Sequence, residues 1–185
     1  RKWAPVAAAS GAIVVDNSSA WRMDPEVPLI VPEINIADVS MAKNKGIIAN
    51  PNCSTIQAVV VLYPLHLAAG LKYINISTYQ SVAGTGIAAV DSLREGAKAA
   101  IKGEPFTDPV YPHTIAFNLL PHIGAFDDEG ISEEEWKMVN ESRKIMHIPN
   151  LRVSGITVRV PSVRCHGESV TAQFEKPITP DEARD

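Results

Sequence analysis

The chain has 185 residues, a formal net charge of −4, 45% hydrophobic and 21% charged residues, and two cysteines. This composition is that of an ordinary globular protein, not of a disordered or fibrous one. The acidic balance and the lack of a basic stripe argue against nucleic acid as a partner, and no apolar run reaches the ~18 residues that a membrane span needs. Cys53 and Cys165 do not form a secreted disulfide framework, so we expect a reducing, cytoplasmic setting.

The first third of the chain alternates short apolar runs with helical stretches, which indicates an α/β segment. The residues before Gly11 resemble the end of a helix. Strands are then expected at 12–15, 27–31 and 47–49, and a short helix within 33–44. A long apolar helix over 53–69 is expected to end at Gly70, because glycine favours helix C-termini.

The rest of the chain mixes strands with two further helices. Residues 73–80 alternate with period two, as a half-buried strand does. A small-residue helix is expected over 87–102, followed by an irregular proline-rich stretch. Ser132 and Glu135 form a capping-box pattern that predicts a helix reaching about residue 147. Two strands, 153–160 and 168–174, follow, and residues 179–185 look like the start of another helix, so we expect a segment of a longer protein.

Cys53 lies just after the turn Asn50-Pro51-Asn52, at the first residue of a predicted helix. A thiol at a helix N-terminus is close to unpaired N–H groups and to the positive end of the helix dipole. Both favour the thiolate, which is the nucleophilic form. The competing interpretation is a buried structural cysteine, because free cysteines are commonly buried.

His166 lies in a loop between two predicted strands, with Arg159 at the end of the first. The imidazole could deprotonate Cys53 and later act as an acid or base, because its unperturbed pKa lies near neutrality. Arg159 could bind a carboxylate with two hydrogen bonds. A surface histidine and a solvated arginine are the alternative. His66, His113, His122 and His147 compete for the base role, but none lies in a comparable setting.

Three further features carry possible chemistry. The stretch from Ser77 to Gly86 runs from a strand into a glycine-containing turn, where a backbone can approach a ligand closely, although it lacks the full dinucleotide fingerprint. Glu134 and Lys137 share a helix face and could present opposite charges to a ligand, or form an ordinary surface pair. Arg22 follows a strand end, where α/β sheets bind ligands. No cysteine or histidine spacing indicates a metal site.

Taken together, these segments resemble the aspartate-β-semialdehyde dehydrogenase family, in the family's order and through nearly the whole chain. The segments that carry the resemblance are Val15–Ser19, Arg22, Val31–Glu33, Asn50–Gln57, Ser77–Gln80, Ile115–Asn118, Glu134–Lys137, Val158–Pro161 and His166–Ser169. The Asn-Cys-Ser-Thr element in combination with Gln80 and His166 is the most specific part.

The resemblance implies an NADP-dependent enzyme that interconverts L-aspartyl-4-phosphate and L-aspartate 4-semialdehyde, in the route to lysine, threonine and methionine. It implies roles residue by residue. Cys53 is the nucleophile that forms a thioester, His166 the acid/base and Gln80 the group that orients the acyl intermediate. The substrate-binding residues are Arg159 for the α-carboxylate, Glu134 for the amino group, and Arg22 and Lys137 with Asn52 for the phosphate. Ala83 and Gly84 match the turn that lies against the cofactor.

The resemblance also implies the architecture. Residues 1–50 correspond to the rear part of a Rossmann-like NADP-binding domain. Residues 51–185 correspond to a catalytic and dimerisation domain with a mixed sheet, similar to that of glyceraldehyde-phosphate dehydrogenase and built into homodimers or homotetramers. The family's first strand and glycine-rich phosphate loop have no counterpart here. We therefore expect the 185-residue segment alone to bind NADP weakly and to show little or no turnover.

Three other functions compete with this interpretation. An N-acetylglutamyl-phosphate reductase would share the catalytic plan, but it would not need a carboxylate such as Glu134 for a free amino group. A cysteine hydrolase using Cys53 and His166 would lack an obvious group to orient the histidine. A non-catalytic interaction module would leave the cysteine unreactive.

Overall fold

The computed structural model describes residues 2–184, which form two compact units, while Arg1 and Asp185 lie outside the described residues. The first unit contains Arg1–Ile74, Lys137–Val153 and Ala172–Asp185. The second unit contains Asn75–Trp136 and Ser154–Thr171. The domain boundary expected near residue 50 stays a prediction.

The first unit contains a small parallel sheet. Strand β1 (Val14–Asp16) pairs with β2 (Ile47–Ala49), with Val14 opposite Ile47, and α1 (Trp3–Ala9) precedes β1. The expected strand over 27–31 is reduced to one parallel bridge between Leu29 and Ala49. Parallel pairing with an intervening crossover is the arrangement of α/β sheets, as expected from the alternating runs.

The short helix expected within 33–44 is present as three short helical segments, a division that the sequence did not indicate. These are α2 (Pro32–Asn35), the 3₁₀ turn η1 (Ile36–Met41) and α3 (Ala42–Lys45). Asn35 has φ −134°, outside the helical range, and its side chain binds the backbone of Leu29 and Val31. Asparagine competes with the helix in this way because its side chain offers local hydrogen bonds.

Helix α4 (Cys53–Ala69) starts and ends at the expected residues. It ends at Gly70, whose φ of +73° favours glycine. Its buried residues, Ser54, Thr55, Ala58, Val59, Leu62 and Ala69, fall mostly on one face of the helix. Helix α6 (Glu133–Ile145) ends two residues earlier than expected, and its capping box forms: the Ser132 N–H donates to Glu135 at 2.8 Å and the Glu135 N–H to Ser132 at 3.3 Å.

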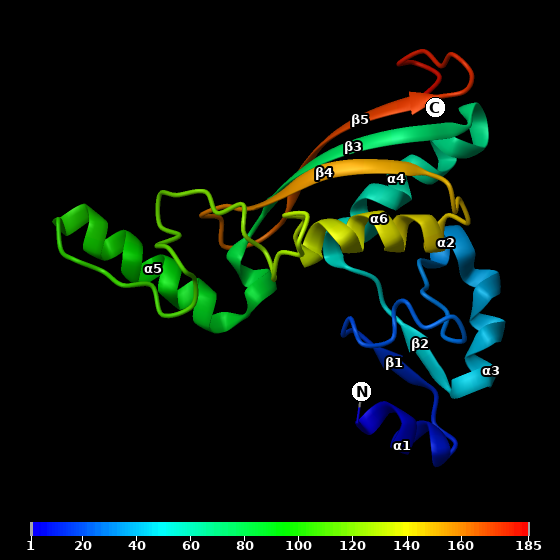
Figure 1. Ribbon diagram of the computed structural model, residues 1–185, viewed down its shortest axis with the longest axis horizontal. Coiled ribbons are helices and arrows are strands. Elements are labelled where there is room, and N and C mark those ends of the chain that lie inside the picture. Colours follow the sequence, from blue (N-terminus) through cyan, green and yellow to red (C-terminus); the bar gives the residue numbers. More distant parts are fainter. Residues whose placement is uncertain (1, 185) are drawn as a thin grey trace. The chain divides into compact units, whose positions relative to one another are not determined.

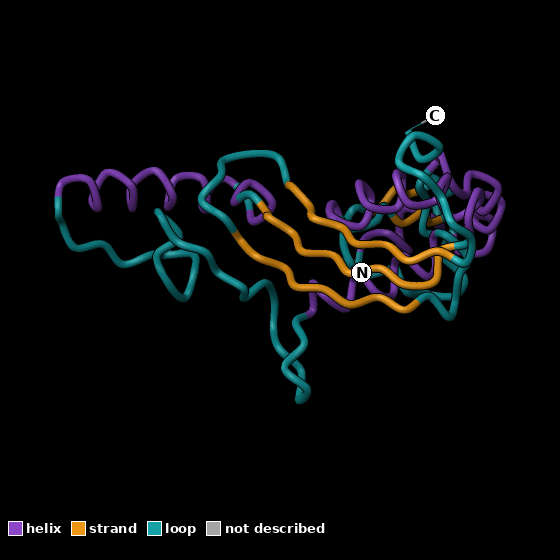
Figure 2. The backbone as a smooth tube through the Cα atoms, turned by 90° about the horizontal axis from the view of Figure 1, so that it is seen from above, coloured by secondary structure: helices purple, strands orange, loops and turns teal. Residues whose placement is uncertain are grey.

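The larger sheet has three strands in the order β4-β3-β5 (Figure 1). These are β3 (Leu71–Gln80), β4 (Arg152–Arg159) and β5 (Gly167–Phe174). The Asn75 side chain donates to Ser154 near the start of β4, and the Val160 N–H donates to the Gln80 carbonyl just after its end. Residue numbers therefore increase in the same direction along both strands, and β4 is parallel to β3. Strand β5 runs the other way, because Glu175 donates to Gly70 at the opposite end. The sheet is therefore mixed, as expected, and Figure 2 shows its three strands as adjacent orange tubes.

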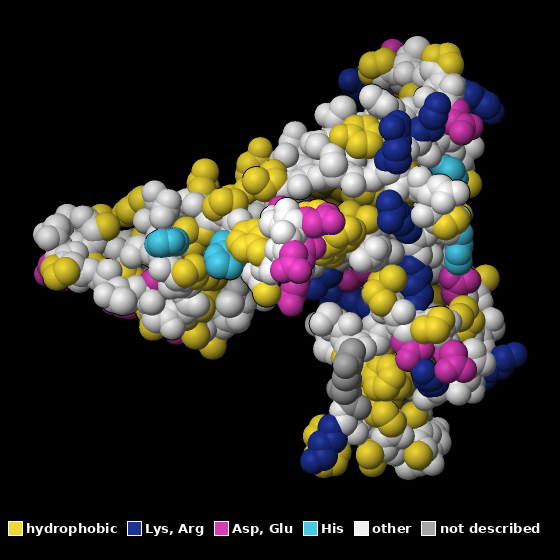
Figure 3. All heavy atoms as spheres, in the orientation of Figure 1, with side chains coloured by type: hydrophobic (Ala, Val, Ile, Leu, Met, Phe, Trp, Pro, Cys, Tyr) yellow, Lys and Arg dark blue, Asp and Glu magenta, His cyan; other side chains and the backbone are white. Residues whose placement is uncertain are grey.

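Helix α5 (Ile87–Lys102) and the irregular chain after it make up much of the second unit. Their core consists of Val82, Ala89, Val90, Leu93, Ile115, Ala116 and Leu120. Asp108 organises the proline-rich stretch, because its carboxylate accepts bonds from the Ser92 hydroxyl and from three backbone N–H groups, those of Val110, Tyr111 and Ile115. Apolar side chains that remain exposed here include Ile87, Ile101, Phe117 and Leu119, and hydrophobic groups are visible on this part in Figure 3.

Between residues 2 and 184, no helix is both long and apolar enough to cross a bilayer. Residues 180–184 form a turn. Thr179 and Glu182 exchange capping-box hydrogen bonds, and the Ala183 N–H donates to the Thr179 carbonyl, as at the expected start of a helix.

Candidate functional site

The residues singled out from the sequence fall into two groups, one in each unit. Arg22, Asn52, Cys53 and Lys137 belong to the first unit. Gln80, Ala83, Gly84, Glu134, Arg159 and His166 belong to the second. The roles assigned to all ten stay predictions, and each group has a geometry of its own.

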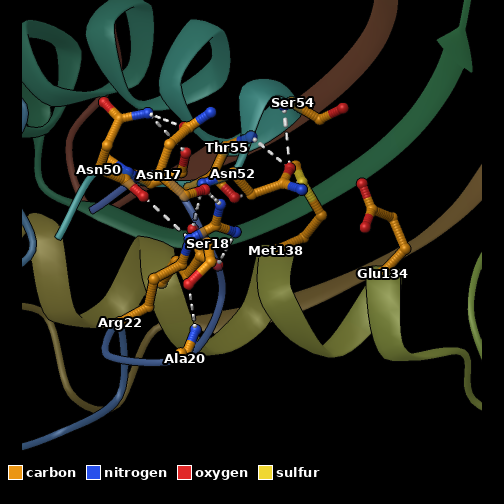
Figure 4. A network of polar contacts seen from close by, with 12 residues as sticks. Asn17, Ser18, Ala20, Arg22, Asn50, Asn52, Ser54, Thr55, Glu134 and Met138 are labelled. Atoms are coloured by element: carbon orange, nitrogen blue, oxygen red, sulfur yellow. Dashed lines mark hydrogen bonds and ion pairs between the residues drawn. The ribbon is translucent and has the colours of Figure 1, made fainter. Parts of the chain in front are cut away.

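Cys53 is the first residue of α4, and its side chain is exposed. The Asn52 side-chain oxygen caps this helix, accepting the Ser54 N–H at 2.9 Å and the Thr55 N–H at 3.3 Å (Figure 4). Asparagine is a preferred N-cap residue, because its side chain satisfies N–H groups that have no partner inside the helix. The exposed thiol at a capped helix N-terminus fits a nucleophile better than a buried structural cysteine does.

Arg22 is buried and engaged by three acceptors of the protein itself, which the sequence did not indicate. Its Nη1 forms an ion pair with Glu141 at 3.0 Å. Its Nε donates to the Asn50 carbonyl at 2.9 Å and its Nη2 to the Asn17 carbonyl at 3.0 Å (Figure 4). Arg22 is therefore a fixed cation that joins the loops at Asn17 and Asn50.

Glu141 is the residue of this unit that sequence reasoning missed. Its carboxylate is 1% exposed and accepts the Asn52 N–H at 2.6 Å in addition to Arg22. Burial raises the pKa of Glu141, while the Asn52 N–H and the Arg22 charge act in the opposite direction. No local signal marked it, because a glutamate four residues after Lys137 is typical of an ordinary pair on a helix surface.

Lys144, one turn beyond Glu141, holds the loop that contains Arg22. Its Nζ donates to the carbonyls of Arg22, Asp24 and Val27 at 2.8, 2.8 and 2.9 Å. Burial lowers the pKa of Lys144. Three bonds from one ammonium group use all its donors, so Lys144 is a structural clamp.

In the second unit, the backbone of Ser81 holds His166. The Ser81 N–H donates to Nδ1 of His166 at 3.0 Å, and the Ser81 hydroxyl lies 3.3 Å from the same nitrogen. Because a backbone N–H can only donate, Nδ1 must accept, and the neutral imidazole carries its proton on Nε2. Burial lowers the pKa of His166, a hydrogen bond to the Cys165 backbone acts in the opposite direction, and the charges of Arg159 and Glu134 oppose each other. The neutral form is therefore favoured at neutral pH.

The same serine also holds Arg159, since Arg159 Nη1 donates to the Ser81 carbonyl at 2.8 Å. Arg159 is 7% exposed, and its buried Nε has no hydrogen-bond partner among residues 2–184. An orphan guanidinium nitrogen is unusual in a protein and suits a bound carboxylate. Ser81 was not singled out from the sequence, because nothing local showed that its backbone N–H and its carbonyl would both bind side chains of the site.

Gln80 and Glu134 form a second polar pair in this unit. The Gln80 side chain is almost fully buried and donates to the Glu134 carboxylate at 3.2 Å and to the Thr78 hydroxyl at 3.3 Å. The end of β3 therefore places an amide beside a carboxylate. Such a pair can orient a polar substrate that carries a cationic group.

Ala83 and Gly84 lie on the exposed 3₁₀ turn η2 (Val82–Thr85). A Cβ atom added at Gly84 would lie 3.3 Å from Arg159 Nη1 and 3.6 Å from two atoms of the His166 ring. The turn thus presents bare backbone next to the imidazole and the guanidinium, which fits the close approach of a flat cofactor ring. No cluster of potential metal ligands occurs in the described part of the chain.

Comparison with known proteins matches two family models to this chain. The model described as "Semialdehyde dehydrogenase, dimerisation domain" matches residues 62–185. The model described as "Semialdehyde dehydrogenase, NAD binding domain" matches residues 1–42. Both matches follow the expected order of a cofactor-binding part and a second domain.

Similar proteins and structures carry one name. The chain is 52% identical to the aspartate-semialdehyde dehydrogenase of Aquifex aeolicus, over all of this chain and 55% of that protein. It is 46% identical to that of Legionella pneumophila, over 53% of that protein. The crystal structure of aspartate semialdehyde dehydrogenase II from Vibrio cholerae matches 98% of this chain and 54% of its own, with 43% identity and a TM-score of 0.97. A second structure of that protein, "complexed with ASA", matches with 42% identity and the same TM-score, covering 99% of this chain and 55% of its own. The chain spans about half the length of the curated relatives it matches.

Proposed function

This chain belongs to the semialdehyde dehydrogenase family, and from that premise we propose that the full-length protein interconverts L-aspartyl-4-phosphate and L-aspartate 4-semialdehyde with NADP. The observation that carries the proposal is the exposed Cys53 at the capped start of α4, in a chain whose similar proteins bear that enzyme's name. The biosynthetic role and a homodimeric or homotetrameric assembly through residues 51–185 are parts of the same proposal.

In the proposed reaction, the Cys53 thiolate attacks the acyl carbon of the substrate, a C–S bond forms and the bond to the phosphate oxygen breaks. The resulting thioester divides one difficult reduction into two easier steps. The N-terminus of α4 stabilises the thiolate by the positive end of the helix dipole. Arg22, Lys137 and Asn52 bind the departing phosphate, which suits the cationic character of the first group.

The second group binds and orients the rest of the substrate. Arg159 binds the α-carboxylate, and its unpartnered Nε supports this role. Glu134 binds the α-amino group, and Gln80 orients the thioester carbonyl. His166, held by Ser81 with its proton on Nε2, offers that N–H as a hydrogen-bond donor to the developing oxyanion, and its proposed acid step uses the imidazolium. In this tautomer Nε2 carries an N–H and not a lone pair, so the neutral ring acts as a hydrogen-bond donor on that side.

When bound, NADPH supplies the hydride that reduces the thioester carbon. We propose that Ala83 and Gly84 hold the nicotinamide ring, because their turn is exposed and a Cβ atom at Gly84 would lie only 3.3 Å from Arg159 Nη1. The choice of NADP over NAD rests on the family resemblance.

The test is the reverse reaction of the full-length protein. With aspartate semialdehyde, phosphate and NADP⁺, we expect NADPH formation that requires phosphate. The same assay with N-acetylglutamate semialdehyde should show far less activity, because Glu134 favours a free amino group. Phosphate-independent hydrolysis of an acyl substrate would support a cysteine hydrolase and refute the proposal.

A matched pair of variants tests the nucleophile. Iodoacetamide should modify Cys53 rapidly at neutral pH, and Cys53→Ser should abolish both this modification and turnover. Cys165 is also exposed, and Cys165→Ser should leave turnover intact. Equal loss of activity in both variants would contradict the proposed role of Cys53.

A further inference from the structure

Three segments of the first unit meet at the Glu141 carboxylate. Oε1 lies 3.0 Å from Nη1 of Arg22, in the loop after β1. Oε2 accepts the Asn52 N–H at 2.6 Å, in the turn directly before Cys53. Helix α6 supplies the carboxylate itself. One buried side chain therefore joins the proposed nucleophile's turn to the proposed phosphate-binding cation.

The two bonds need an ionised carboxylate. Both partners of Glu141 are donors, and each uses a different oxygen. A glutamine of the same shape offers one acceptor and one NH₂ group, so it would turn a donor toward either Asn52 or Arg22. A protonated glutamic acid has the same defect. The geometry thus requires two acceptors, which an unprotonated acid alone provides.

Keeping this charge buried is costly for the fold. An ion pair taken out of water commonly contributes little net stability, because desolvation offsets the attraction. The 1% exposure of Glu141 and its raised pKa show that burial opposes its ionised form. Lys137 and Arg22 are the charged groups that act on it favourably. A residue kept only for stability would have little need of this charge.

We propose that Glu141 is a positioning residue of this site, whose ionised carboxylate fixes the Cys53 turn and the Arg22 guanidinium in one arrangement. The inference rests on the proposed function and deepens it. Both Glu141 oxygens bond to groups of the protein itself. It acts through Asn52, whose backbone leads into the first turn of α4, and through Arg22.

The experiment measures Cys53 alkylation by iodoacetamide and steady-state turnover in the full-length protein, for wild type, Glu141→Gln and Glu141→Asp. We expect Glu141→Gln to lower both the alkylation rate and kcat by about tenfold to a hundredfold, since small displacements of a reacting group have effects of this size. The KM for the aldehyde should change little. Glu141→Asp keeps the charge and both oxygens, so it should retain more activity than Glu141→Gln although its shape differs more.

Asp24→Asn is the matched control. Asp24 also pairs with a cation, Lys45, at 2.6 Å and accepts one backbone N–H, that of Glu26, at 2.9 Å. It belongs to the same unit but contacts neither the Cys53 turn nor the Arg22 guanidinium in any described interaction. This variant should leave alkylation and kcat unchanged.

The outcomes separate the two proposals. If wild type does not turn over aspartate semialdehyde, the proposed function fails, whereas the alkylation rates still test Glu141. If Glu141→Gln equals wild type in both readouts, or exceeds Glu141→Asp in both, the positioning role is refuted. A general loss of folding in both variants, with Asp24→Asn intact, would mean that Glu141 is structural and would refute it as well.

Discussion

The two groups of proposed site residues are held in place by different forces. In the first unit, the turn before Cys53 depends on side-chain charge, because Glu141 joins the Asn52 N–H to the Arg22 guanidinium. In the second unit, His166 and Arg159 depend on the main chain, because Ser81 donates to one and accepts from the other. The first arrangement responds to pH and to loss of one side chain. The second follows from the path of β3 and tolerates side-chain changes at Ser81.

The largest expected effect is the loss of turnover when the nucleophile of the first group is replaced. Cys53→Ser removes the nucleophile, and we expect kcat to fall about 10³-fold or more, because residues that act together in covalent catalysis lose most of their effect when one is removed. Single-turnover measurement of NADPH oxidation with aspartyl phosphate checks this. Retained turnover in Cys53→Ser would contradict a thioester mechanism.

The second prediction concerns the buried charge pair itself. Arg22→Met leaves Glu141 buried without its cation, and breaking such a pair costs about 3–5 kcal/mol of unfolding free energy. Changing both partners, in Arg22→Met with Glu141→Leu, should cost less than the sum of the two single changes, because no uncompensated charge remains. Urea unfolding of all four proteins measures the coupling.

Lys45→Met provides the comparison for that cycle. Lys45 pairs with Asp24 and Glu26 at a partly exposed position, where ion pairs add little to stability. We expect little or no change in its unfolding midpoint. A loss as large as that of Arg22→Met would show that burial is not the reason for the difference.

The third prediction tests the main-chain support of His166. Ser81 has φ −66°, which suits proline, and the residue before it is in an extended strand. Ser81→Pro removes the N–H that Nδ1 accepts, whereas Ser81→Ala removes only the hydroxyl. We expect kcat to fall about a hundredfold in the proline variant, the size of a general-acid contribution, and much less in the alanine variant.

Nitrogen NMR of the imidazole separates positioning from folding in this pair. Wild type and Ser81→Ala should show the proton on Nε2 of His166 at neutral pH, and Ser81→Pro should lose this preference. If the alanine variant loses as much activity as the proline variant, the hydroxyl and not the main chain supports His166.

The contrast between the groups also explains what the sequence could predict. Helix α4 and the nucleophile turn were predicted to the residue, because the proline turn, the polar start and Gly70 are local signals. The strands of the mixed sheet were placed within two residues, β3 by its alternation and β4 and β5 as strand-like runs. The broken helix at Asn35 was missed, because its side chain binds the backbone of a segment that precedes it in the chain.

Glu141 and Ser81 could not be found in this way. Glu141 is 89 residues from its partner Asn52 and 119 from Arg22, and Ser81 is 85 residues from His166. No pattern in the neighbouring sequence shows that a glutamate on a helix is buried, or that a backbone N–H at the end of a strand binds a side chain and not the next strand. Residues whose chemistry is visible from their type, such as Cys53, could be proposed from the sequence. The residues that position them could be identified only from the three-dimensional structure.

The smallest effect is a pH dependence that sharpens the role of Glu141. A carboxyl group whose pKa is higher in the folded than in the unfolded protein binds protons more readily when folded. Its contribution to stability is therefore fully present below the ordinary pKa of 4.5 and is lost as the pH rises through the raised value. Between neutral pH and 4.5, acidification should stabilise wild type relative to Glu141→Gln, which has no such titration.

The rate of Cys53 alkylation should fall on acidification as Glu141 is protonated, whereas the stability of the fold should rise. Protonated Glu141 offers one acceptor fewer, so the turn before Cys53 loosens while the fold gains stability. The ratio of wild-type to Glu141→Gln alkylation rates should fall on acidification, and taking this ratio removes the titration of the thiol and of His166, which both proteins share. Urea unfolding and alkylation over the same pH series measure the two trends. If the relative stability and the ratio of alkylation rates both rose on acidification, the Glu141 charge would not position the turn before Cys53.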